Sequence, residues 1–263
     1  MLKFSEYEPY YGLLSEAAAQ QGFVYENNAA KVLKKFGIVP TNFTPAGAGS
    51  DIPDLMIQKD GIKAGCELKI TAASAGSLVM KYDKGTWSIG NPNEKNDEKI
   101  FVMELAEEVG IIDKLGEIWN REPYKFTNDE NIKKEIEGLG KREIYSAEKD
   151  RFPEQNGEIP ASKIEDYYSM KKTYYINVGT HGFYLLGSKN PLKLKGISRF
   201  GTSAKAKYRA RVQAKGGGNY QFTFEMQFSI AKAMKSDYNI APIMGKNNVK
   251  INMDKLELDW FLK

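Results

Sequence analysis

The stretch "DLMIQKDGIKAGCELKI", residues 54–70, decides the predicted fold. Two short apolar runs flank an Asp-Gly pair, which is typical of tight β-hairpin turns. Charged residues nevertheless lie in these runs: Asp54 opens the first, and the second carries Glu67 and Lys69. Because side chains alternate between the two faces of a strand, Glu67 and Lys69 share one face. The hairpin brings Asp54 alongside, so two carboxylates and an ammonium are predicted at one edge of a small sheet.

This grouping suits hydrolysis of a phosphodiester. Hard divalent cations, Mg²⁺ above all and Mn²⁺ as a substitute, bind carboxylate oxygens and keep several waters. Such an ion neutralises the phosphate and activates a bound water, and a nearby lysine can orient or help deprotonate that water and offsets charge on phosphorus. Asp54 and Glu67 are therefore predicted metal ligands, and Lys69 a catalytic residue. The alternative is a surface hairpin whose solvated Glu67–Lys69 pair contributes only ~0.2–1 kcal/mol.

The spacing of these residues resembles a known signature. Pro53-Asp54, twelve further residues and then Glu67-Leu68-Lys69 is similar to the motif of the PD-(D/E)XK nuclease superfamily, which includes type II restriction endonucleases and many repair and phage nucleases. In that family a preceding helix often contributes a further acid, and Glu26 in "YENNAAKVLKKFG" matches its place. The resemblance implies Glu26 as a further catalytic residue.

The resemblance also implies an α/β fold with a restriction-endonuclease-like core, a central mixed sheet flanked by helices. The family order is helix, three strands, helix, strand. In this chain the corresponding segments are helix 25–36, strands near 42–46, 53–58 and 64–70, helix 163–172 and strand 174–178. Asp51 is close enough in sequence to Asp54 to be a secondary ligand.

The remaining chain is predicted to belong to the same single domain, residues 1–263. "SLVMKY" and "TWSIG" indicate a second hairpin, and residues 91–160 form an acidic, helical insertion or subdomain. A serine at position 162 followed by Glu165 matches a capping box, which predicts a helix start there.

A basic segment, residues 189–218, follows. No Asp or Glu lies between Tyr167 and Phe224, and four cations recur at every second position from Lys205 to Arg211. They share one strand face, while an aromatic-rich partner strand after a glycine turn completes an additional C-terminal β-hairpin. We expect phosphate contacts from this face. The alternative is an edge strand kept lysine-rich against aggregation. The predicted nucleic-acid-binding residues are Arg199, Lys205, Lys207, Arg209, Arg211 and Lys215.

Composition excludes several classes of protein. No apolar run approaches the ~20 residues of a membrane-spanning helix, so we expect no membrane partner. The single cysteine, Cys66, excludes an intramolecular disulfide, and the single histidine, His181, excludes histidine-pair metal motifs. A cytoplasmic location follows as an expectation, in a bacterium or, for a phage-encoded protein, in an infected host.

The predicted function is a metal-dependent DNA endonuclease, similar to type II restriction enzymes, whose products carry 5′-phosphates as the resemblance implies. Its partner is double-stranded DNA, and a homodimer is expected if the cleaved site is symmetric. Two alternatives stay open: a structure-specific phage or repair nuclease acting on junctions or flaps, and a non-catalytic DNA-binding protein on a nuclease fold.

Overall fold

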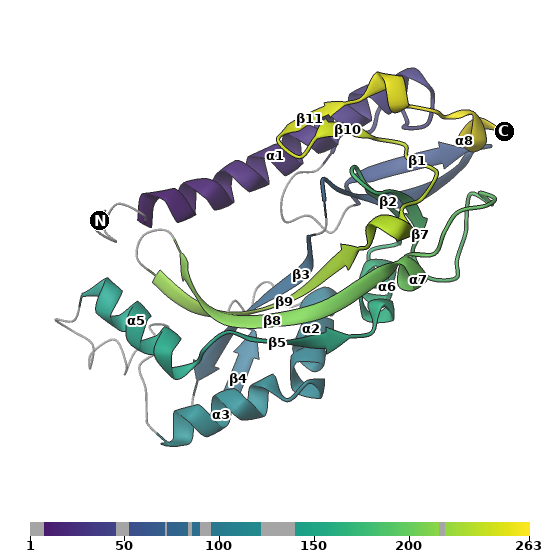
Figure 1. The fold of residues 1–263 in the computed structure, drawn as a ribbon. Helices are drawn as coiled ribbons and strands as arrows, with labels where there is room; N and C mark the ends of the chain where they lie inside the picture. Colours follow the sequence, from purple (N-terminus) through teal and green to yellow (C-terminus); the bar gives the residue numbers. More distant parts are fainter. Residues whose placement is uncertain are drawn as a thin grey trace. The chain divides into compact units, whose positions relative to one another are not determined.

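The computed structural model describes residues 8–45, 53–71, 73–83, 86–89, 96–121, 140–215 and 219–263. The chain divides into two compact units. Unit 1 comprises Met1–Ala73, Pro160–Ala206 and Phe228–Lys263, and unit 2 comprises Ser74–Ile159 and Lys207–Gln227. The predicted acidic insertion, 91–160, therefore falls in unit 2 except for its last residue. The predicted α/β class is confirmed, because helices flank a mixed sheet in unit 1 (Figure 1).

The sheet of unit 1 has the order β1-β2-β6-β7. Its strands are β1 (Leu55–Lys59), β2 (Ile62–Lys69), β6 (Thr173–Val178) and β7 (Gly182–Leu185). β2 and β6 are parallel, and the other two pairings are antiparallel. In the predicted β1–β2 turn, Asp60 (φ 51°) and Gly61 (φ 77°) are both left-handed, as a type I′ hairpin turn requires.

One face of this sheet is covered by α1 (Glu8–Lys35), which starts well before the predicted residue 25. Its buried side chains belong to the same apolar core as alternate residues of β1 and β2. The predicted stop is confirmed, since Gly37 adopts a positive φ of 72° just after the helix. Near α1 run the short strands β10 (Ile243–Gly245) and β11 (Asn248–Ile251) (Figure 1). The other face receives α6 (Ala161–Met170).

Two local predictions are wrong. Residues 41–45, assigned to a strand at 42–46, form a turn and an irregular segment. Pro40 before the segment and Pro45 at its end lack backbone donors. β1 bonds instead to the chain before the segment, through Gln58 N–H and the Ile38 carbonyl (2.7 Å). The predicted capping box is also absent, because α6 starts after Pro160 without a side-chain cap. Glu165 is buried and accepts a hydrogen bond from Gly201 N–H (2.8 Å).

Unit 2 is built on a five-stranded sheet of order β4-β3-β9-β8-β5. The strands are β3 (Ser74–Asp83), β4 (Thr86–Ile89), β5 (Gln155–Ile159), β8 (Ala204–Lys215) and β9 (Asn219–Ile230), so β8 and β9 extend into unit 1 at one end. Its helices are α2 (Asp97–Glu108), α3 (Ile111–Arg121) and α5 (Lys141–Arg151). The second predicted hairpin is confirmed as β3–β4, and the basic hairpin as β8–β9.

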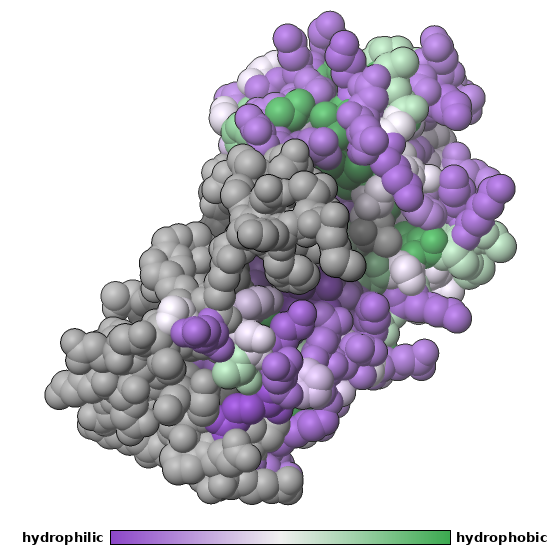
Figure 2. Space-filling model, turned by 60° about the vertical axis from the view of Figure 1, so that its left-hand side comes forward, coloured by the Kyte–Doolittle hydropathy of each residue, from purple (hydrophilic) through white to green (hydrophobic). Residues whose placement is uncertain are grey.

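The remaining elements of unit 1 are short. They are α7 (Phe200–Ser203), α8 (Asp259–Leu262) and two 3-10 helices, Lys232–Met234 and Met253–Lys255. Among the residues coloured by hydropathy in Figure 2, hydrophilic ones predominate. Among the helices that the structure describes, none has the length and apolar character needed to cross a membrane.

Candidate functional site

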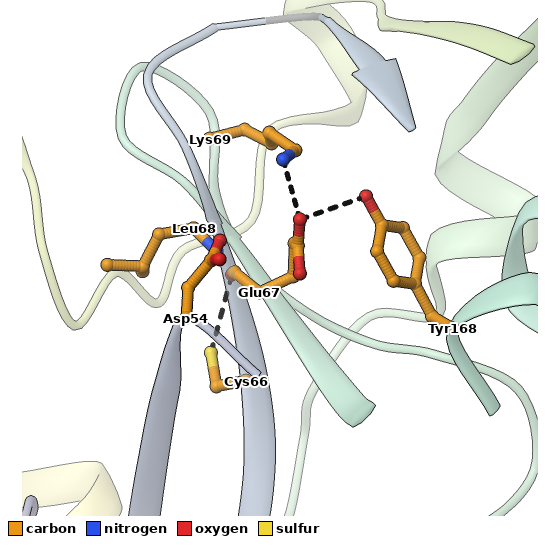
Figure 3. Close-up of polar contacts among 6 residues, drawn as sticks. All are labelled: Asp54, Cys66, Glu67, Leu68, Lys69 and Tyr168. Carbon is orange, nitrogen blue, oxygen red and sulfur yellow. Dashed lines mark hydrogen bonds and ion pairs between the residues drawn. The ribbon is translucent and has the colours of Figure 1, made fainter. Parts of the chain in front are cut away.

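The candidate site lies where β1 begins and β2 ends. β1 and β2 pair Leu55 with Cys66, and continuing this antiparallel register by one residue sets Asp54 opposite Glu67. Asp54 Oδ2 accepts a hydrogen bond from the backbone N–H of Leu68 (2.8 Å), which fixes the carboxylate against β2 (Figure 3). The structure therefore brings together the two acids that the sequence predicts as metal ligands.

A glycine allows this close approach. A Cβ on Gly65 would lie 2.6 Å from Cγ of Pro53 and 2.7 Å from the carbonyl oxygen of Lys172, far inside normal contact distance. Only a residue without a side chain lets β2 pass between these two groups. Gly65 thus positions the Pro53-Asp54 pair against the strand that carries Glu67.

Glu67 is the most enclosed of the charged residues of the site, with 4% of its surface exposed. Its Oε1 accepts hydrogen bonds from Lys69 Nζ (2.6 Å) and from the hydroxyl of Tyr168 (3.2 Å) (Figure 3). Its Oε2 is buried and has no hydrogen-bond partner among the described residues. A buried carboxylate oxygen without a donor is costly in free energy, so a cation bound by this oxygen would offset that cost.

The charges gathered at the site favour the binding of a cation. Burial and the like charges of Glu67 and Glu26 raise the pKa of Asp54 to about 7, against the opposing effects of the lysine ammonium and the Leu68 N–H. Burial alone would lower the pKa of Lys69, but the three surrounding carboxylates outweigh it and raise this pKa above its ordinary value. The amine therefore stays protonated, whereas the carboxylates repel one another.

Glu26, on α1, belongs to the same electrostatic cluster. Burial and the charge of Glu67 raise its pKa, and Lys69 opposes that shift. The helix acid predicted from the family resemblance thus lies close enough to interact with both. Asp51, the predicted secondary ligand, lies outside the described residues.

Tyr168 was missed by the sequence reasoning. It sits on α6, 101 positions after the glutamate it contacts, and is fully buried. Burial and the nearby carboxylates raise the pKa of its hydroxyl, which keeps the proton it donates to Glu67. The sequence predicted the helix, but no local signal indicates which of its side chains faces β2.

A divalent metal fits this donor set in part. Within the described ranges, no group of three or more Asp, Glu, His or Cys residues is arranged to hold a metal ion. Two carboxylates, Asp54 and Glu67, remain, and Mg²⁺ characteristically takes one or two carboxylates and fills its shell with water. The unpartnered Oε2 of Glu67 and the raised pKa of Asp54 both favour a cation here.

The predicted nucleic-acid-binding residues are spread along the chain rather than gathered at this site. Arg199, just before α7, is exposed, and so are Lys205 and Lys207 on β8. Arg209 and Arg211 are half-buried because both interact with a glutamate on β9. The side chain of Lys215 lies outside the described residues.

The arrangement can hold a hard cation between two carboxylates and keep an ammonium beside it, next to a polar edge of the sheet. These are the groups that phosphodiester hydrolysis needs. Searches of protein-family models, of curated proteins and of solved structures find no match to the chain.

Proposed function

We propose that the chain is a metal-dependent DNA endonuclease that hydrolyses phosphodiester bonds and leaves 5′-phosphates. The observation that carries the proposal is the convergence of Asp54, Glu67 and Lys69, with Oε2 of Glu67 buried and unpartnered. A structural ion pair needs one carboxylate for one amine. This site contains an excess of buried negative charge, and a divalent cation is the simplest group that compensates it.

Asp54 and Glu67 would hold Mg²⁺, which lowers the pKa of a bound water and neutralises the phosphate when it is bound. Lys69 remains a cation because its pKa is raised. Its role is therefore to orient the attacking water and to offset the negative charge that develops on phosphorus, not to remove a proton. The attacking water forms one P–O bond and releases a proton to solvent, and the bond to the 3′ oxygen breaks as that oxygen gains a proton from solvent.

The proposal is tested by incubating purified protein with supercoiled plasmid and, separately, with a four-way junction, in Mg²⁺, Mn²⁺, Ca²⁺ or EDTA. We expect cleavage in Mg²⁺ and Mn²⁺ only, and its loss in Asp54→Asn, Glu67→Gln and Lys69→Met. Asp60→Asn, at the exposed end of the same hairpin, is the matched control and should cleave normally. Discrete plasmid fragments support a restriction-like enzyme, and cleavage of the junction alone supports a structure-specific one.

DNA binding without cleavage under every metal would reject the enzyme and leave a binding protein. The predicted homodimer is measured on the same preparation by light scattering after gel filtration, with and without DNA. If both strands of a symmetric site are cut, a two-fold symmetric dimer is the expected species.

A further inference from the structure

One face of β8 carries four cations, Lys205, Lys207, Arg209 and Arg211. The position of β8 in the sheet gives no structural reason for them. Its buried residues alternate with cations, and β8 lies between β9 and β5 rather than at the sheet edge. β5 covers part of β8, so protection of an exposed edge, the alternative for such a lysine-rich strand, does not explain the cations along the covered part. Its apolar face packs in the core of unit 2, where the Tyr208 ring stacks on Phe224 with centroids 5.5 Å apart.

The four cations of this face are not equivalent. Lys205 and Lys207 are exposed, and no acid is paired with either side chain among the described residues. Arg209 donates through Nε and Nη2 to Oε1 of Glu225 on β9, and Nη2 of Arg211 lies 3.7 Å from the same oxygen. One carboxylate thus serves two arginines.

Glu225 lies beneath the guanidinium groups it holds. Its side chain is 13% exposed, whereas those of Arg209 and Arg211 are 26% and 32% exposed. The carboxylate is therefore more enclosed than the two arginine side chains that it holds, and both of these keep part of their surface exposed. A phosphate that approached them would compete with Glu225 for the same donors.

We propose that this β8 face binds the phosphate backbone of double-stranded DNA, with the two lysines as direct contacts and the two arginines restrained by Glu225. The choice of DNA rests on the proposed function. Alternate side chains on a strand are roughly 7 Å apart, which is about two axial phosphate steps of one DNA strand at 3.4 Å each. A row of like charges with this spacing is stabilised by a polyanion of matching repeat.

The test measures binding of a fluorescent 20-base-pair duplex in EDTA as a function of salt, in a chain carrying Asp54→Asn so that cleavage cannot interfere. In this background, Lys205→Gln/Lys207→Gln should weaken binding about tenfold and flatten the slope of log K against log salt by roughly 1.8, the value for two lost phosphate contacts. The matched control, Lys31→Gln/Lys63→Gln, removes two exposed charges elsewhere and should leave the slope unchanged.

Glu225→Gln tests whether Glu225 restrains Arg209 and Arg211. Releasing the arginines should tighten binding several-fold and steepen the salt slope by about 1, since a freed guanidinium gains a phosphate contact. The same change made together with Arg209→Gln and Arg211→Gln should not steepen it. If Glu225→Gln leaves the salt slope unchanged or flattens it, the Glu225 carboxylate does not compete with phosphate for the arginines.

Failure of this inference is distinguishable from failure of the proposed function. If the wild type cleaves DNA in Mg²⁺ but the lysine variant binds like its control, the β8 face is not the DNA contact. If no metal supports cleavage but the lysine variant loses binding and slope, the β8 face stands and the endonuclease does not. Tighter binding of this face to anionic phospholipid vesicles or to single-stranded RNA than to the duplex also overturns it.

Discussion

Replacing Asp54 with asparagine should make the metal-free protein more stable while abolishing its activity. Asparagine keeps an oxygen that accepts the Leu68 N–H bond, so the local geometry is preserved. It removes the negative charge that burial and the neighbouring acids oppose. A residue retained at such a cost to the fold is expected where function requires it.

The sign and size follow from the pKa of Asp54. In the unfolded chain this carboxyl releases its proton near its ordinary pKa of 3.8, but in the folded protein it holds the proton up to about pH 7. Between these values the folded state binds more protons, so the free energy of unfolding falls as pH rises. At 1.36 kcal/mol per pKa unit, the wild type loses about 2–4 kcal/mol between pH 4 and pH 8.5 that the asparagine variant retains.

Urea unfolding followed by circular dichroism in EDTA checks this at pH 4.0 and pH 8.5. The variant and the wild type should differ little at pH 4.0, and the variant should be the more stable protein at pH 8.5. Asp60→Asn, in the exposed turn, should stay within about 0.5 kcal/mol of wild type at both pH values. Adding Mg²⁺ at pH 8.5 should stabilise the wild type and not the variant. An equal difference at both pH values, or a less stable variant at pH 8.5, would refute the electrostatic reasoning.

Three further changes have specific outcomes. Tyr168→Phe removes one hydrogen bond to the candidate metal ligand, worth about 0.5–1.5 kcal/mol, so cleavage and Mg²⁺ affinity measured by calorimetry should fall up to about tenfold with the fold intact. Gly65→Ala should destabilise the protein by about 1–3 kcal/mol in urea, because its Cβ meets Pro53 and a carbonyl, whereas Gly116→Ala in α3 meets nothing and should not destabilise it. Both oxygens of Glu148 are buried without a partner, and burial raises its pKa to about 8, so Glu148→Gln should be the more stable protein at pH 9 by about 1–3 kcal/mol and equal at pH 5, as measured by urea unfolding.

The hairpin at residues 55–69 could be predicted because its determinants are local. An Asp-Gly turn fixes the register, and the register fixes which side chains share a face. The same reasoning placed the cations of β8 on one face and the aromatic residues of β9 on the other. Each of these predictions needs only the alternation of a strand and a turn that closes it.

What the sequence did not reveal depends on contacts between distant segments. The segment 42–46 was predicted to be a strand from its apolar and β-branched residues. A strand there also needs a partner, and β1 bonds to Ile38 instead. The Ser162 capping box failed because α6 begins before Ser162, with Pro160 at its N-cap, and Glu165 accepts a hydrogen bond from Gly201 N–H instead. The Tyr168 contact with Glu67 could not be found for the same reason. Propensity describes what a segment can do alone, and tertiary contacts decide among the possibilities.

The sheet of unit 1 requires only a small part of the chain that lies between β2 and β6. β2 and β6 are parallel neighbours, so the chain between them must cross over, and a dozen or more residues with one helix are enough for that. α6 alone meets this requirement and also delivers Tyr168 to Glu67. The segment Ser74–Ile159 is therefore additional to what the sheet of unit 1 needs. Asp54, Glu67, Lys69 and Tyr168 all belong to unit 1, so the site is built without a residue from this segment.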